Sequence, residues 1–272
     1  MDNRFVLRFI LLLLVFSVSF CCFAKKDKEK KKRAAQVELY GLVDPDRVPE
    51  KPRPDHYSRP LDKPLLVHHG KEGLHGFDIS HYQGHVNFDA LATDPNAGYI
   101  YLKASEGAGN KDNMYDTYHR EARRVGFKIG SYHFFRGNVS AREQFENFRS
   151  VLRGKHQDLI PIIDVEVIAK RVSIYQYMER LSELLVMVER EYGKKPMIYT
   201  GQRFYNQHFA GTKFVGKYKF MIACYTDNEP LLHNNDDFLI WQFTGSGSAR
   251  GVRGHIDISK FVRGHTIHEI MF

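Results

Sequence analysis

From residue 76 onward, short segments rich in β-branched and aromatic residues alternate with longer segments of helical periodicity. The short segments predict strands at 76–80, 99–107, 129–135, 161–167, 197–200, 220–225, 238–243 and 255–259. The longer ones predict helices at 88–92, 113–125, from Ser140 to 153 and from Ser173 to Gly193, with no long helical pattern between the last three strands. Such alternation favours an α/β fold with a parallel sheet, and eight strands favour its closure into a barrel.

Polar side chains fall at or near the carboxyl ends of these predicted strands. They are Asp78, Glu106, His133, Asp164, Glu166, Thr200, Tyr225, Gln242 and Asp257. The carboxyl ends of barrel strands meet at one rim, where active sites form. We therefore expect distant parts of the chain to bring these residues into one acidic pocket lined by aromatic rings.

Two of the acids interrupt the apolar segment PIIDVEV at 161–167. Residues two apart on a strand face the same side, so Asp164 and Glu166 are expected side by side, with Cα atoms roughly 6 to 7 Å apart. Burial of two like charges raises the pKa of at least one carboxyl, which keeps a proton donor protonated near neutral pH. The alternative is a strand end whose acids meet lysines or water, and this segment alone does not distinguish the two.

The charge of the chain is unevenly distributed. The formal net charge is +8, but residues 1–60 hold 13 Lys and Arg against 8 Asp and Glu, and the remaining residues hold 27 against 24. The folded part therefore has little basic excess, which argues against a nucleic-acid partner. With 272 residues in total, the chain is long enough for one large α/β domain, which we place at 75–272.

The first residues resemble an export signal. Arg4 and Arg8 precede an apolar run at 9–20, and Ala24 ends a segment suited to signal cleavage, so 1–24 is predicted to be a signal peptide. A lipoprotein signal acylated at Cys21 or Cys22 is the alternative, and an uncleaved anchor is a third. We expect an exported protein, periplasmic, in the cell envelope or secreted, that touches a membrane only through this segment. The basic, proline-rich residues 25–74 are predicted to be an arm or linker.

Eight short motifs follow one another in a specific order along the chain. They are DISHYQG at 78–84, YLKASEG at 101–107, GSYHFF at 130–135, DVE at 164–166, IYT at 198–200, IACY at 222–225, WQF at 241–243 and HIDIS at 255–259. As an ordered set they resemble glycoside hydrolase family 25, the Chalaropsis-type lysozymes, over about residues 74–264. The resemblance implies a TIM-like modified barrel, (β/α)5(β)3. It also implies hydrolysis of the β-1,4 bond between N-acetylmuramic acid and N-acetylglucosamine in peptidoglycan.

The resemblance also assigns roles to the acids. Glu166 matches the proton donor of the family, and Asp164, Asp78 and Asp257 match the other acids of its site. These three would stabilise the oxocarbenium-like charge, orient the substrate or polarise its acetamido group. Hydrolysis through a covalent sugar ester and substrate-assisted attack by the N-acetyl group both stay open.

Further residues are predicted to contact or support the substrate. Tyr132, Tyr199, Tyr225 and Trp241 offer flat faces for sugar rings, although aromatic residues on strands often belong to the core. Gln242 and His133 are polar rim residues, His133 being expected to be neutral and hydrogen-bonded. Glu106 is either a site acid or the ion-pair partner of nearby Lys103. No spacing typical of a zinc site occurs, so we expect neither metal nor organic cofactor.

Two other functions remain open at this point. One is a cell-wall-binding protein that keeps the fold without the chemistry, and the other is a hydrolase of chitin-type polymers. The presence of all four acids favours an enzyme over a binding protein. We expect a monomer, because no apolar face is left over in the pattern.

Overall fold

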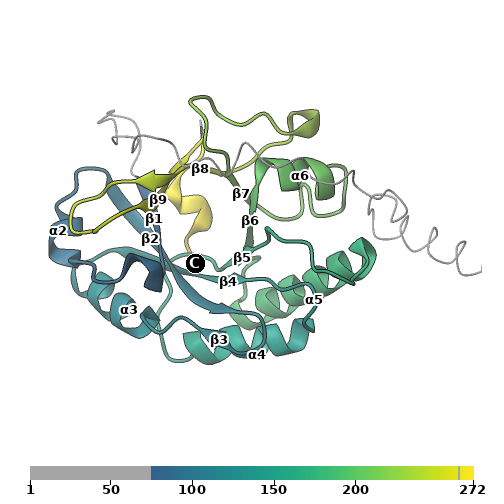
Figure 1. Ribbon diagram of the computed structural model, residues 1–272, viewed down its shortest axis with the longest axis horizontal. Coiled ribbons are helices and arrows are strands. Elements are labelled where there is room, and N and C mark those ends of the chain that lie inside the picture. Colours follow the sequence, from purple (N-terminus) through teal and green to yellow (C-terminus); the bar gives the residue numbers. More distant parts are fainter. Residues whose placement is uncertain (1–74, 263) are drawn as a thin grey trace, which may run out of the picture.

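The computed structural model, which describes residues 75–262 and 264–272, is built around one sheet that closes on itself (Figure 1). Its strands are β1 (His75–Ile79), β2 (Ala97–Glu106), β3 (Asn110–Lys111), β4 (Lys128–Phe134), β5 (Ile162–Asp164), β6 (Met197–Gly201), β7 (Phe220–Ala223), β8 (Ile240–Gly247) and β9 (Ile256–Phe261). The ring runs β1-β2-β4-β5-β6-β7-β8-β9 and returns to β1, while β3 pairs only with the end of β2. The predicted barrel is therefore confirmed.

A helix follows each of the first five ring strands and lies outside the ring (Figure 1). These helices are α2 (Phe88–Ala92), α3 (Tyr115–Arg124), α4 (Ala141–Leu152), α5 (Ile174–Tyr192) and α6 (Gln202–His208), with 3-10 turns η2 (His81–Gln83), η3 (His233–Asn235) and η4 (Ile267–Ile270). No α-helix follows β7, β8 or β9 among the described residues, which gives the (β/α)5(β)3 arrangement. The predicted signal and arm at 1–74 lie outside the described residues.

The best-defined helices begin at the predicted serine caps. The Ser173 hydroxyl accepts a hydrogen bond from the Gln176 backbone and forms a full capping box, and Gly193 ends α5 with φ of 70°. Ser140 caps α4 in the same way, but its hydroxyl donates to the Glu143 carboxylate at 2.6 Å. Helix α6 was not predicted, because its seven residues are too few for a periodic pattern and its N-cap has no side-chain hydrogen bond.

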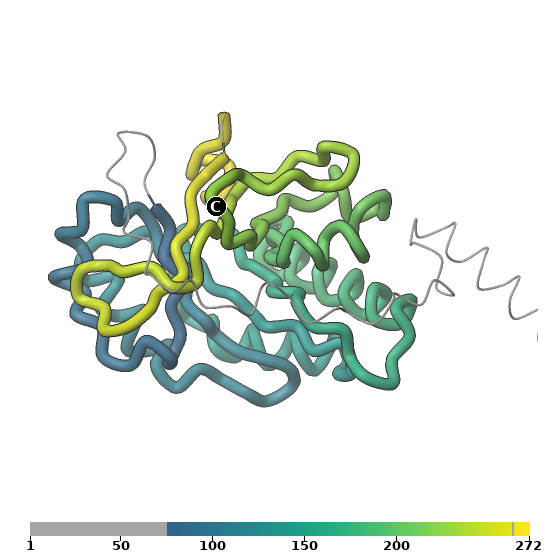
Figure 2. Tube along the Cα trace, turned by 45° about the horizontal axis from the view of Figure 1, so that its top comes forward, coloured from purple at the N-terminus to yellow at the C-terminus, as the bar shows by residue number. Residues whose placement is uncertain are grey.

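Strand β9 departs from the expected parallel order. It runs antiparallel to both β8 and β1, whereas the other ring strands are parallel to their neighbours. The hairpin between β8 and β9 reaches over the segment after β1, where Val86 bridges Val252 and the Asn87 N–H donates to the Gly251 carbonyl at 2.8 Å (Figure 2). This contact braces the hairpin from which β9 begins.

Large side chains fill the barrel interior near the amino ends of the strands. Tyr99 and Tyr101 are fully buried inside the ring, and the Tyr101 hydroxyl donates to the Ile160 carbonyl at 3.1 Å. The C-terminal turn η4 closes the amino ends of the strands, because the Ile160 N–H donates to the fully buried Ile270 at 2.8 Å. The barrel interior is therefore packed near the amino ends of the strands. Within the described ranges, none of the helices combines the length and apolar character needed to cross a bilayer.

Candidate active site

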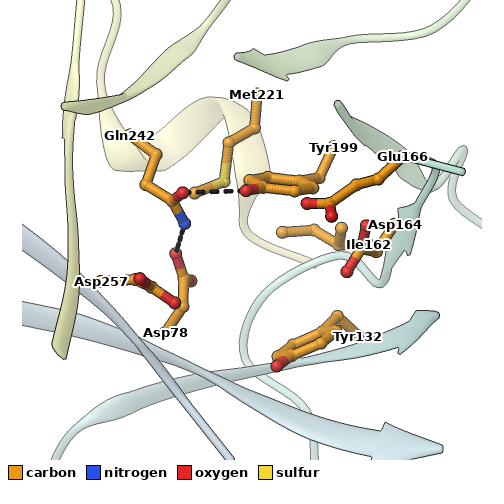
Figure 3. Close-up of a pocket in the computed structure, with 9 residues that line it drawn as sticks. All are labelled: Asp78, Tyr132, Ile162, Asp164, Glu166, Tyr199, Met221, Gln242 and Asp257. Atoms are coloured by element: carbon orange, nitrogen blue, oxygen red, sulfur yellow. Dashed lines mark hydrogen bonds between the residues drawn. The ribbon is translucent and has the colours of Figure 1, made fainter. Parts of the chain in front are cut away.

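A pocket lies at the carboxyl end of the parallel strands (Figure 3). It is lined by Asp78, Tyr132, Ile162, Asp164, Glu166, Tyr199, Met221, Gln242 and Asp257. The pocket opens to solvent, and its empty space, open mouth included, is about 390 Å³. All four acids that the sequence singled out for catalysis therefore meet in one place.

Asp78 and Asp257 enter the pocket from neighbouring strands of opposite direction. They are direct partners in the β1–β9 ladder, and side chains of directly paired residues project to the same face. Asp257 was expected at the carboxyl end of its strand, but it is the second residue of β9. Since β9 runs antiparallel, its amino end reaches the same rim as the carboxyl ends of the other strands.

Gln242 links the aspartate side of the pocket to two tyrosines. Its side-chain N–H donates to Asp78 Oδ2 at 2.7 Å, and its Oε1 accepts from the hydroxyls of Tyr199 and Tyr225, each at 2.8 Å. Two donors on the oxygen fix the orientation of the amide and direct its N–H to the carboxyl. Hydrogen bonds through Gln242 thus connect Asp78, Tyr199 and Tyr225, all of which the sequence had singled out.

The strand that carries the other two acids is shorter than predicted. The sequence indicated a strand at 161–167, but β5 ends at Asp164, and Glu166 follows in the connection to α5. Two further backbone bonds, from the Phe135 N–H to the Asp164 carbonyl and from the Val165 N–H to the Tyr199 carbonyl, hold this exit in place. Both acids still line the pocket, as expected.

Asp164 and Glu166 differ in their access to solvent. Asp164 is 7% exposed, and its Oδ1 is buried without a hydrogen-bond partner among the described residues. Glu166 is exposed at the mouth, and its side chain turns toward the cavity beside Tyr199 (Figure 3). A buried carboxyl without a partner is far less costly when protonated than when charged. Glu166, in contrast, can exchange protons with solvent.

The four carboxyls all bind protons more tightly than ordinary acids do. Burial, and secondarily the nearby Glu166 charge, hold the pKa of Asp164 well above its usual range. Burial raises the pKa of Asp78 to about 7, and burial together with the charges of Asp78 and Glu166 raises the pKa of Asp257 to about 8. Although Glu166 as a residue is exposed, its carboxyl points into the pocket, where loss of hydration raises its pKa, opposed by Tyr199 and Lys103. The arrangement can hold and deliver protons near neutral pH.

Glu106 is an ion-pair residue and does not line the pocket. Its Oε2 lies 2.9 Å from Lys103 Nζ, and its Oε1 accepts from Arg136 Nε at 2.9 Å. Although burial works against ionisation, these two cations hold the pKa of Glu106 below its usual value. The structure thus favours the second of the two expected roles, that of a partner for Lys103.

Tyr225 does not line the pocket, although its hydroxyl bonds to Gln242, and two further predicted substrate contacts are buried away from the pocket. Trp241 is 5% exposed, packs in the layer between strands and helices, and donates its indole N–H to the Cys224 carbonyl at 2.7 Å. His133 is fully buried under α4, where its Nδ1 lies 2.8 Å from Ser105 Oγ and its Nε2 3.3 Å from Gln144 Oε1. Burial lowers the pKa of His133 to about 4, which agrees with a neutral ring. Neither side chain presents a surface to a sugar.

Two apolar pocket residues were not singled out from the sequence. Ile162 and Met221 also line the pocket. The signal for Ile162 was its spacing of two from Asp164, which places both on the inward face of the strand. Among the described residues, no cluster of His, Cys, Asp or Glu has the grouping needed to hold a metal ion.

Comparisons with known proteins agree with this geometry. The model of glycosyl hydrolases family 25 matches residues 77–252. The protein YegX of Escherichia coli K12 is 30% identical over 194 residues, which cover 69% of each chain. An autolytic lysozyme of Clostridium acetobutylicum is 30% identical over 191 residues, or 70% of this chain and 56% of that protein.

The fold is similar to that of solved structures. A bacterial lysozyme from Streptomyces coelicolor superimposes with a TM-score of 0.64 at 25% identity, over 73% of this chain and 96% of that one. The family model alone spans more than half of the 272 residues. The chain therefore belongs to glycosyl hydrolases family 25.

Proposed function

We propose that this glycoside hydrolase is an exported muramidase, which cleaves the β-1,4 bond between N-acetylmuramic acid and N-acetylglucosamine in peptidoglycan. The observation that carries the proposal is the convergence of Asp78, Asp164, Glu166 and Asp257 on one pocket with raised pKa values. Relatives named as lysozymes support the choice of substrate. Export and a monomeric state remain predictions from the sequence.

Glu166 is the proposed general acid and base. It stands at the mouth of the pocket, where its proton can reach the glycosidic oxygen and can be replaced from solvent. Its raised pKa keeps the carboxyl protonated to higher pH than an ordinary glutamate. In the second half of the reaction the same group, now ionised, takes a proton from the attacking water.

The other acids and the tyrosines act on the sugar. Asp164 lines the same pocket as Glu166 and, when ionised, stabilises the positive charge that develops on the sugar ring. The Asp78–Gln242–Tyr199 chain holds polar atoms in fixed positions for the hydroxyl and acetamido groups. Tyr132 and Tyr199 provide ring faces on the pocket wall, and Tyr225 reaches the same network through Gln242.

The test is digestion of purified peptidoglycan and chitin in parallel by the full chain, with the new reducing ends identified by mass spectrometry. We expect muropeptides ending in N-acetylmuramic acid and no chitin fragments. Cleavage of chitin would instead indicate a chitin-type hydrolase, and binding to walls without cleavage would indicate a binding protein.

Glu166→Gln tests the proposed acid and base. Loss of general acid–base catalysis should lower turnover on peptidoglycan by about 100-fold or more. Glu183→Gln, the same change at an exposed position on α5, is the matched control and should keep wild-type turnover. Wild-type turnover by a folded Glu166→Gln variant would refute the assignment.

A further inference from the structure

The amino ends of the strands, opposite the pocket, carry a group of uncompensated positive charges. Exposed cations there are Lys128, Arg153, Lys194, Lys195 and Lys217, and none forms an ion pair within the part of the chain that the structure describes. Lys128 begins β4, Arg153 follows α4, Lys194 and Lys195 precede β6, and Lys217 precedes β7. Because β4 to β7 are parallel, these positions share one end of the barrel, which we call the amino-end face.

Three acids of this face pair with other cations, whereas Asp94 and Glu189 form no ion pair among the described residues. Asp158 pairs with Arg123 at 2.8 Å, and Glu191 pairs with Arg149 at 2.8 Å. Glu269 lies 3.6 Å from Lys219. The five unpaired cations outnumber these two acids, so the face keeps a net positive field directed at solvent.

The chain enters and leaves the barrel at this same face. His75, the first residue of β1, lies at the amino end of the parallel ring strands, so residues 1–74 join the domain here. In sequence those residues include the basic segment KKDKEKKKR at 25–33, which follows the predicted signal peptide. At the other terminus Phe272 is 43% exposed, and its N–H donates to the Asp158 carbonyl at 3.1 Å. The face thus combines cations with an exposed aromatic ring.

We infer that the amino-end face docks on the surface of an anionic phospholipid bilayer and directs the pocket away from the membrane. Basic residues near such a surface each strengthen binding about fivefold, and an aromatic ring is favoured at the boundary between head groups and acyl chains. A membrane fits better than a soluble polyanion, because the exposed ring of Phe272 accompanies the cations and can enter the boundary of the acyl chains. Docking would place the pocket opposite the bilayer, toward glycan strands.

Hydrogen exchange of the full chain tests the inference, with nanodiscs of neutral lipid compared with nanodiscs containing anionic phosphatidylglycerol. Anionic lipid should slow exchange at 193–195 and 211–219 at least threefold, with no change in the loops around the pocket. The variant K194Q/K195Q/K217Q should lose this protection, although its residues 1–74 are unchanged. Raising the salt concentration should weaken the protection as well.

A matched control removes three positive charges from the opposite end. Lys111, Lys170 and Arg253 are exposed on β3, on the connection after β5 and on the β8–β9 hairpin, so K111Q/K170Q/R253Q should keep full protection. Equal protection by neutral and anionic lipid would overturn the inference. Loss of protection in the control variant, or the same protection from a soluble polyphosphate, would overturn it too. Activity on soluble glycan fragments is independent of the outcome, which separates this test from that of the proposed function.

Discussion

Asp257 and Asp78 face each other across the β1–β9 ladder, and burial raises the pKa of these carboxyls to about 8 and about 7. A carboxyl whose pKa is higher in the folded chain than in the unfolded chain binds more protons when folded. Stability therefore falls as the pH rises from about 4 to about 8, and the loss is complete above that range. These acids reduce stability at the pH at which they would function, a common trade-off in active sites.

Asp257→Asn should remove much of this loss of stability at high pH. We expect the free energy of unfolding to increase by about 2 kcal/mol at pH 9 and to change little at pH 4, measured by urea denaturation at both values. Asp227→Asn, at an exposed position in the connection after β7, should change stability little at either pH. An equal gain from Asp257→Asn at pH 4 and pH 9 would contradict the raised pKa.

Tyr199→Phe should change the pH dependence of hydrolysis. The Tyr199 hydroxyl opposes the rise in the pKa of Glu166, so its loss should raise that pKa further. A proton donor of higher pKa stays protonated to higher pH. The alkaline limb of the pH profile, where kcat/KM on peptidoglycan falls, should therefore move to higher pH. Tyr192→Phe, at the end of α5, should leave the limb in place. A downward shift would contradict the proposed role of Glu166.

At the residue scale, the sequence predicted which acids meet in the pocket. It did not predict which of two adjacent strand residues points into the barrel. Gln242 lines the pocket while Trp241 beside it packs against the outer layer. In the same way Tyr132 points inward and His133 outward. Strands of a parallel barrel are buried on both faces, so their sequences lack the polar–apolar alternation that would reveal side-chain direction.

At the scale of the elements, glycines in the barrel strands provide space for the tyrosines that fill its interior. A Cβ atom on Gly130 of β4 would lie 2.2 Å from Tyr101 Cε1, a contact that the packed interior cannot relieve without movement of the ring. This glycine is required for the close approach of the ring. It therefore belongs to the packing of the barrel.

Gly130→Ala should destabilise the protein by about 2 to 3 kcal/mol through this overpacking, measured by urea denaturation. Gly109→Ala is the matched control, because a Cβ there would have nothing within 4 Å. We expect the control to change stability by less than about 0.5 kcal/mol. A tolerated Gly130→Ala would mean that Tyr101 can repack.

Local signals predicted the longer elements and missed the short ones. Serine caps and helical periodicity located α4 and α5 to within a few residues. Strand β5 is three residues long because only those pair with both neighbours, although the apolar pattern continues to residue 167. The direction of β9 was also beyond the sequence, since a strand carries no local mark of the sense in which its neighbours run.

At the scale of the molecule, the C-terminal turn η4 seals the amino end of the barrel. Ile270 is fully buried inside the ring, and Leu159 bridges Met271. This closure was not predicted, because four residues with one buried side chain give no periodic signal. The ordered motifs, in contrast, did predict the overall architecture, through their resemblance to glycoside hydrolase family 25.

Ile270→Ala should leave a cavity at the base of the barrel. We expect a loss of about 2 to 4 kcal/mol in the free energy of unfolding, measured by denaturation in urea. Leu231→Ala, whose side chain is 78% exposed, should cost far less. Equal effects of the two changes would show that η4 does not seal the barrel.

Strand β9 is the last of the ring to be synthesised, and it joins β8 to β1 while supplying Asp257. A polypeptide that stops before this strand has neither a closed ring nor its fourth acid. Hydrolytic activity is thus expected only after β9 has emerged from the ribosome and paired with β1.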